Sequence, residues 1–94
     1  MSAPSSEWGS ALRTMRRLFE HEPTDKESLK EWQKEAMALL LRLDTIPESN
    51  DMEEIAWHFL DDADIRVKDE GYARVQREGF ESWLKDAERA LPPE

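Results

Sequence analysis

The chain has 94 residues, no cysteine and a formal net charge of −9 at pH 7. A chain of this length forms one domain with a modest core, so we expect a single domain over residues 1–94, with flexible tails at residues 1–5 and 92–94. The lack of cysteine excludes disulfides, thiolate catalysis and zinc bound by cysteine. The negative charge disfavours nucleic acids and anionic membranes as partners. No secretory signal or bilayer-spanning apolar run is visible, so we predict a cytoplasmic protein.

The first predicted helix covers residues 6–21. Its apolar side chains recur three and four residues apart, which places them on one stripe. Arg13, Arg16 and Arg17 lie on the opposite side. The Glu-Pro pair that follows ends the helix, because the residue before a proline is pushed out of the helical region.

The second predicted helix covers residues 25–44. Thr24 and Glu27 form a capping-box pattern at its start, in which each side chain accepts the backbone N–H of the other residue. Its C-terminal half is apolar around most of the circumference, with Met37 and Leu41 outside the main stripe. We therefore expect this helix to be the most buried of the set.

The third predicted helix covers residues 51–70, after a connector at residues 45–50. Asn50 and Glu53 form a second capping-box pattern, with Ser49 as a competing N-cap. A single apolar stripe continues through the whole segment. Gly71 is the expected C-terminal stop, because glycine adopts the left-handed conformation that often ends helices.

The fourth predicted helix covers residues 72–91. Gly79 lies on its apolar side, where the missing side chain would let another backbone come close. An alternative interpretation joins the third and fourth segments into one helix that is kinked at Gly71. No segment alternates apolar and polar residues, so the sequence predicts an all-α bundle of four helices, mostly antiparallel. The predicted core residues are Trp8, Leu12, Met15, Phe19, Leu29, Trp32, Ala36, Leu40, Leu43, Ile55, Phe59, Leu60, Ala63, Tyr72, Val75, Phe80, Trp83 and Ala87.

The acidic stretch at residues 50–71 is the most informative part of the surface. Eight acidic residues against two basic ones give it a net charge of −6. On a helical wheel, Trp57 and Ile65 lie more than ~90° from the centre of the buried stripe and share one face, two turns apart. Large apolar groups on a charged surface are typical of interfaces. The polar residues predicted to share this partner-binding face are Glu54, His58 and Asp61.

This pattern predicts a non-enzymatic acidic protein-interaction module, such as an adaptor, an inhibitor or an immunity- or antitoxin-like protein. Its partner would have a basic, partly apolar surface. Three other interpretations remain open. The third helix could be buried on two sides, Trp57 could cover the edge of its own helix, or the face could join two copies in a homodimer.

A small nucleic-acid-binding regulator is the alternative function, with Arg13, Arg16 and Arg17 as the phosphate-binding ridge. Metal and cofactor sites are not predicted. The two histidines, His21 and His58, lack the Glu-x-x-His spacing of a di-iron bundle, and the acidic run lacks the glycine and glutamate of a calcium loop. The three glycines are scattered, so no phosphate loop exists.

Overall fold

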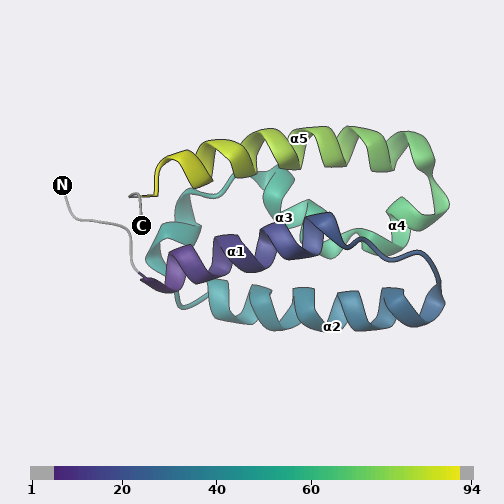
Figure 1. Cartoon of the computed structure of the whole chain (residues 1–94), viewed down its shortest axis with the longest axis horizontal. Helices are drawn as coiled ribbons and strands as arrows, with labels where there is room; N and C mark the ends of the chain where they lie inside the picture. The colour runs from purple at the N-terminus through teal and green to yellow at the C-terminus, as the bar shows by residue number, and fades with distance from the viewer. Residues whose placement is uncertain (1–5, 92–94) are drawn as a thin grey trace.

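The computed structural model describes residues 6–91, which form an all-α bundle without a strand, as predicted (Figure 1). The residues expected to be flexible tails, 1–5 and 92–94, lie outside the described part. In chain order the elements are α1 (Ser6–Glu20), α2 (Lys26–Leu43), a 3₁₀ helix (Pro47–Asp51), α3 (Glu54–Asp61), α4 (Ala63–Lys68) and α5 (Glu70–Arg89).

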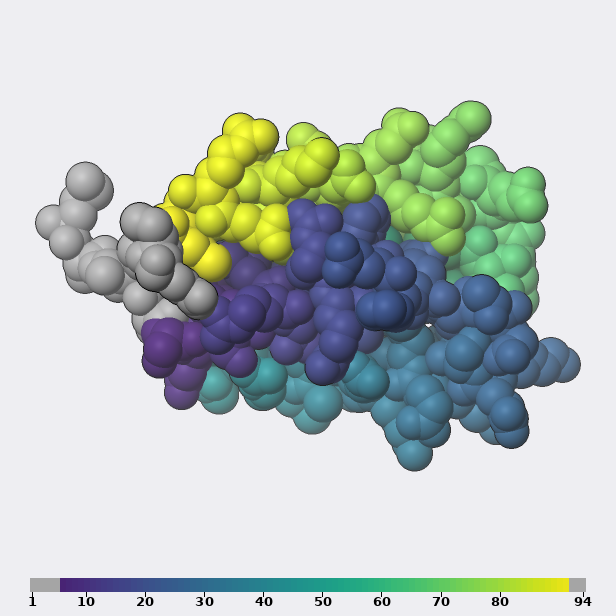
Figure 2. All heavy atoms as spheres, viewed as in Figure 1, coloured from purple at the N-terminus to yellow at the C-terminus, as the bar shows by residue number. Residues whose placement is uncertain are grey.

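Three long helices and one broken helix make up the bundle. α1 runs antiparallel to both α2 and α5 and packs between them, and Figure 2 shows it filling the middle of one face. α3 packs against α5 and α2, and α4 continues along α5 towards the far end. The pair α3–α4 therefore takes the fourth position of the bundle.

α2 begins with a capping box one residue later than predicted. The carboxylate of Asp25 accepts the N–H of Ser28 at 2.7 Å, and the Ser28 hydroxyl accepts the N–H of Asp25 at 3.0 Å. These bonds, the backbone one above all, lower the pKa of Asp25. Serine replaces Glu27 in the pair because its short hydroxyl reaches back from the third helical position.

The prediction of one helix over residues 51–70 is wrong. Asn50 lies inside the 3₁₀ helix, and Glu53 precedes α3 without a capping hydrogen bond from its side chain. The buried hydroxyl of Ser49 instead donates to the carbonyl of Leu43 at 2.6 Å. This bond satisfies a backbone carbonyl in the last turn of α2 and holds the 3₁₀ helix against the end of α2.

Asp69, and not Gly71, separates the last two helices. The backbone of Asp69 is extended, and its carboxylate accepts the N–H of Tyr72 at 3.0 Å, so α5 begins at Glu70. Gly71 lies in the first turn of α5, and no described glycine has a positive φ. The glycine stop and the fused, Gly71-kinked helix are therefore both wrong, because an aspartate N-cap starts a new helix here.

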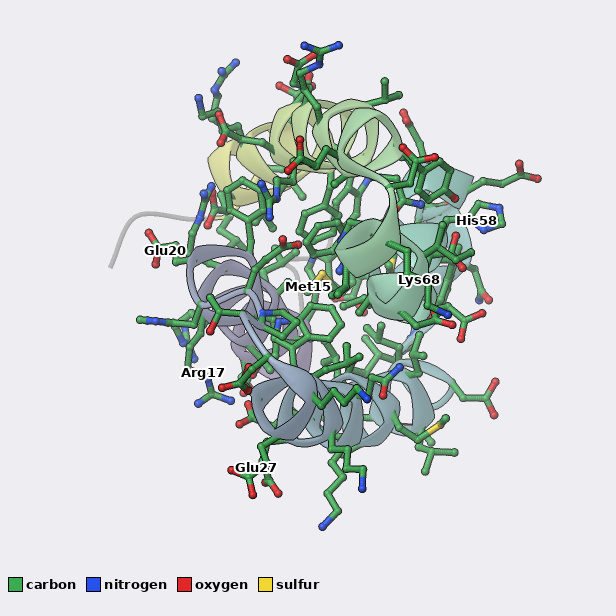
Figure 3. All side chains as sticks on the ribbon, turned by 90° about the vertical axis from the view of Figure 1, so that its right-hand side faces the viewer. Met15, Arg17, Glu20, Glu27, His58 and Lys68 are labelled. Carbon is green, nitrogen blue, oxygen red and sulfur yellow. The ribbon has the colours of Figure 1, made fainter. Side chains whose placement is uncertain are left out.

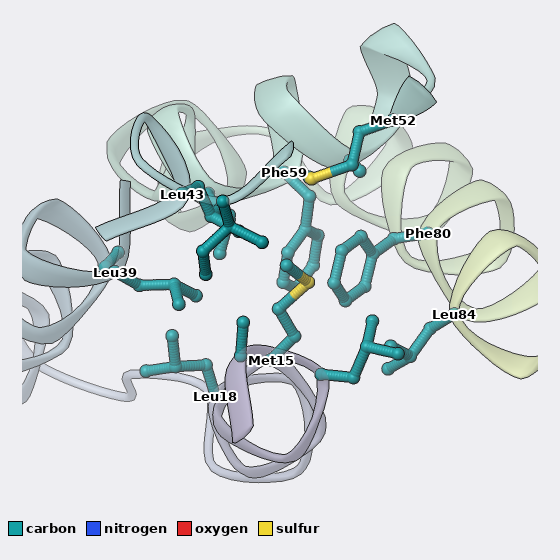
Figure 4. Close-up of a cluster of buried hydrophobic side chains, with 14 of the residues drawn as sticks. Met15, Leu18, Leu39, Leu43, Met52, Phe59, Phe80 and Leu84 are labelled. Atoms are coloured by element: carbon teal, nitrogen blue, oxygen red, sulfur yellow. The ribbon is translucent and has the colours of Figure 1, made fainter. Parts of the chain in front are cut away.

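An aromatic cluster fills the centre of the bundle. The rings of Phe59 and Phe80 stack with centroids 4.0 Å apart and planes 9° from parallel. Phe19 lies 5.9 Å from both of them, and Trp32 meets Phe59 edge-on at 5.9 Å. Figure 4 shows Met15, Leu39, Leu43, Met52 and Leu84 pointing towards these stacked rings, while Leu18 points towards Leu39. α1, α2, α3 and α5 each contribute at least one of these side chains.

Most of the predicted core is confirmed. The predicted residues that are buried are Trp8, Leu12, Met15, Trp32, Ala36, Leu43, Phe59, Leu60, Ala63 and Phe80. The predicted residues that are half-buried are Phe19, Leu29, Leu40, Ile55, Tyr72, Trp83 and Ala87. The prediction that Val75 belongs to the core is wrong, since its side chain is 64% exposed on α5. It lies on the outer side of α5, beyond the reach of α1 and α3.

The burial of α2 also differs from the prediction. Leu39 is fully buried where Leu40 is only half-buried, and Met37 and Leu41 are 56% and 68% exposed. α1, α3 and α4 are the helices that pack against α2, and the side that carries Met37 and Leu41 has no neighbour among the described elements. α2 is therefore not the most buried helix.

Gly79 lets α3 approach α5. A Cβ atom at this position would lie 3.0 Å from Cγ1 of Ile55, closer than ordinary contact. The group that fills the space is a side chain of α3, and not the backbone that was expected from the sequence.

Candidate functional site

The residues predicted to bind a partner lie on α3 and α4. Glu54, His58 and Asp61 are exposed, and their spacing of four and three residues puts them on one side of α3. Figure 3 shows His58 pointing away from the bundle. Ile65 is 43% exposed on α4, whereas Trp57 is half-buried and packs against the core. Trp57 therefore belongs partly to the core and offers a partner only its edge.

The structure does not place Trp57 and Ile65 on one helix. α3 ends at Asp61, and the backbone of Asp62 leaves the helical region before α4 begins at Ala63. The helical wheel that related the two residues assumed an unbroken helix. Ile65 instead shares the short α4 with Val67, which is 52% exposed.

Arg66 explains the break. Its side chain is 2% exposed and turns into the bundle, where Nη1 donates to the carbonyl oxygen of Phe59 at 2.5 Å. That carbonyl belongs to the last turn of α3. The guanidinium thus gives this carbonyl oxygen the hydrogen bond that a backbone N–H would donate in a continuous helix.

The same guanidinium joins three further elements. Nε donates to Glu22 in the α1–α2 connector at 2.9 Å, and Nη1 donates to Gln76 of α5 at 2.9 Å. The guanidinium carbon lies 3.9 Å from the ring centroid of Phe59 and 5.2 Å from that of Trp32. Within the described part of the chain, Nη2 is buried without a hydrogen-bond partner, and the two rings face the cation instead.

The charge of Arg66 is compensated mainly by Glu22. Burial lowers the pKa of the guanidinium, and the attraction and hydrogen bond of Glu22 oppose that shift. Glu22 also pairs with Arg77 of α5. An arginine stays protonated at any ordinary pH, so this buried site always holds a cation beside the carboxyl group of Glu22.

A hydrogen-bond chain leads from Arg66 to the surface of α3. Gln76 accepts from Arg66 and donates to the carboxylate of Asp62 at 3.2 Å, which also accepts from the Tyr72 hydroxyl at 2.8 Å. The bond to Asp62 raises the pKa of Tyr72. His58 Nδ1 lies 3.7 Å from Asp62 at the outer end. These contacts hold the α3–α4 junction against the start of α5.

The inward turn of Arg66 makes the outer surface more acidic than the sequence count indicates. Its charge compensates Glu22 inside the bundle, so Lys68 is the basic residue of stretch 50–71 that remains exposed. The exposed acidic residues of the same stretch include Glu53, Glu54, Asp61, Asp64, Asp69 and Glu70. The predicted acidic face therefore lies over α3, α4 and their connections.

Two of the three arginines considered for nucleic-acid binding, Arg16 and Arg17, form ion pairs with carboxylates of other helices. Arg16 donates to Glu88 of α5 from Nε at 3.1 Å, and this bond raises the pKa of Arg16. Arg17 donates to Glu35 of α2 at 2.7 Å. Arg13 also has an interaction partner. Phosphates would have to compete with these contacts.

Four large apolar side chains are exposed on the described helices: Met37, Leu41, Val67 and Val75. The periodicity placed Met37 and Leu41 outside the main stripe of the second segment, but it placed Val67 and Val75 on apolar stripes and Val75 in the predicted core. The signal that could have separated them is the number of neighbouring helices, which a helical wheel does not contain.

A pocket of about 660 Å³ opens where α1, α4 and α5 meet. Phe19, Val67 and Ala73 supply its apolar lining, and three arginines and three glutamates supply the rest. The opposite charges offset one another, so the lining selects neither an anion nor a cation. The described residues also contain no group of three side chains that could hold a metal ion.

Within residues 6–91, no helix is long and apolar enough to cross a membrane. No protein-family model matches the chain, and neither the curated proteins nor the solved structures compared with it include a significant match.

Proposed function

We propose that the protein is a non-enzymatic protein-interaction module that binds a basic, partly apolar partner through the outer side of α3 and α4. The supporting observation is the exposure of Ile65 on α4, next in the chain to the exposed carboxylate of Asp64, together with the exposed carboxylates of Glu54 and Asp61 on α3. Apolar side chains supply contact area that loses water on binding, and the surrounding carboxylates select a basic partner and speed its encounter.

A homodimer through this same face is disfavoured. Two copies would bring their acidic residues together around a two-fold axis, and Lys68 is the basic residue of that stretch available to offset them. A foreign basic surface meets no such repulsion. An adaptor or an inhibitor would use this arrangement equally well.

Capture of partners from the native cell extract tests the proposal. The full-length chain is compared with an Ile65→Ser variant and with the charge reversal Glu54→Lys/Asp61→Lys. All three side chains are exposed, so the thermal midpoint should change little. We expect both variants to lose a partner that the parent chain retains, and the charge reversal to lose it most completely at low salt.

Val75→Ser is the matched control, because Val75 is an exposed apolar residue on α5. It should retain the partner. A partner set that is the same for the parent chain, Ile65→Ser and the charge reversal would contradict the proposed binding face.

A further inference from the structure

The outer side of α2 carries a strip of exposed residues that the proposed function does not use. Met37 and Leu41 are four residues apart, about 6 Å along the helix, and so lie one above the other. Lys34 precedes Met37 and Asp44 follows Leu41, at helical spacings that keep all four on the same side. We call Lys34, Met37, Leu41 and Asp44 the α2 strip.

The α2 strip faces away from the rest of the bundle. On one flank of α2, Glu35 bonds Arg17 and Arg42 bonds Ser10, which marks the side towards α1. The buried side is marked by Leu39. By helical spacing the strip lies opposite to Leu39, and neither Lys34 nor Asp44 has an ion-pair partner among residues 6–91.

α2 is also the electroneutral part of an acidic protein. Residues 26–44 contain four basic and four acidic side chains, whereas the whole chain carries −9. Two copies that approach through α2 therefore keep their acidic α3–α4 surfaces apart. A second copy meets less repulsion here than at that acidic surface.

The order of residues along the strip is complementary to itself. Along the axis of α2, Met37 and Leu41 lie at equal distances on either side of Leu39. Lys34 and Asp44 also lie at equal distances on either side of it. If two α2 helices lie antiparallel around a two-fold axis at that level, Met37 of each meets Leu41 of the other. Lys34 of each then meets Asp44 of the other, which gives two equal ion pairs flanking an apolar centre.

We propose that the protein forms an antiparallel homodimer through the α2 strip. The occupant of this helix face is a second copy, because the strip supplies both the apolar contacts and the charges that its own partner needs. A contact between single helices is smaller than a standard interface, so the dimer forms only at high protein concentration. This inference does not depend on the proposed function of α3 and α4.

Sedimentation equilibrium of the full chain up to roughly millimolar concentration measures the dimer directly. The parent chain should approach twice the mass of one copy. Leu41→Glu should sediment as a monomer, while Val75→Glu, which changes an equally exposed residue of α5, should dimerise as the parent does.

The charge pair is tested by mixing two variants. Lys34→Glu and Asp44→Lys each place like charges opposite one another twice, so each alone should dimerise roughly tenfold more weakly. An equimolar mixture restores opposite charges at both pairs and should regain the parent's dimerisation. Circular dichroism melting confirms that each variant is folded.

Three results would overturn the inference. The parent chain could remain monomeric throughout the concentration range. Lys34→Glu and Asp44→Lys could dimerise as well as the parent. The mixture could also stay as weakly associated as its two components.

Discussion

Replacement of Arg66 by alanine should lower the free energy of unfolding by about 3–5 kcal/mol, because it removes the buried partner of Glu22 and leaves other polar groups unsatisfied inside the bundle. Glu22 loses its inner ion pair, Gln76 loses a donor, and the carbonyl of Phe59 at the end of α3 is left unsatisfied. Urea unfolding followed by circular dichroism measures the loss.

Arg77→Ala is the matched control for this prediction. Arg77 also pairs with Glu22, but half of its side chain is exposed, so its removal should cost less than about 1 kcal/mol. If the loss for Arg66→Ala is as small as that for Arg77→Ala, the guanidinium does not hold the junction of α3 and α4.

Replacement of Phe59 by alanine should also cost about 3–5 kcal/mol, since it opens a cavity at the centre of the core. The ring is fully buried, stacks on Phe80 and lies beneath the guanidinium of Arg66. Its removal therefore takes away both an aromatic contact and a face for the buried cation. Thermal and urea unfolding of the variant test this expectation.

Val75→Ala is the comparison for Phe59. Val75 was predicted to be in the core and is largely exposed, so its truncation should change the free energy of unfolding by less than about 0.5 kcal/mol. A large loss at Val75, or a small one at Phe59, would contradict the packing described for α5.

The fold class was predictable because each long helix has one continuous apolar stripe. The exact position of burial on α2 was not, because the adjacent residues Leu39 and Leu40 both fit the apolar stripe and the periodicity does not choose between them. The positions of the neighbouring helices decide that Leu39 is buried and that Leu40 is only half-buried. Tertiary neighbours set the burial where the pattern is apolar all around.

The sequence contains a weak indication of the break between α3 and α4. Arg66 is three residues after Ala63 and seven after Phe59, so it falls on the buried stripe of the third segment. Gln76 falls on the buried stripe of α5 in the same way. Two polar residues at core positions indicate a buried hydrogen-bond pair, although the sequence does not show that Arg66 bonds the backbone and interrupts the helix.

The candidate site was predictable in charge but not in shape. The excess of carboxylates in residues 50–71 follows from composition alone, whereas the half-buried position of Trp57 follows from the packing of α3 against α2 and α5. Val67 continues the apolar stripe of the third segment, although it was not among the predicted core residues. The separate α4 exposes it together with Ile65.

The inward position of Arg66 underlies both the broken third helix and the acidity of the outer surface, and one NMR measurement tests it directly. In a ¹⁵N- and ¹³C-labelled sample, the Cα shifts should be helical on both sides of Asp62 and interrupted there, with a second interruption at Asp69. The Nε–H signal of Arg66 should exchange with solvent far more slowly than that of Arg74, which is exposed. Unbroken helical shifts from Glu54 to Glu70, with a rapidly exchanging Arg66 Nε–H, would contradict the account.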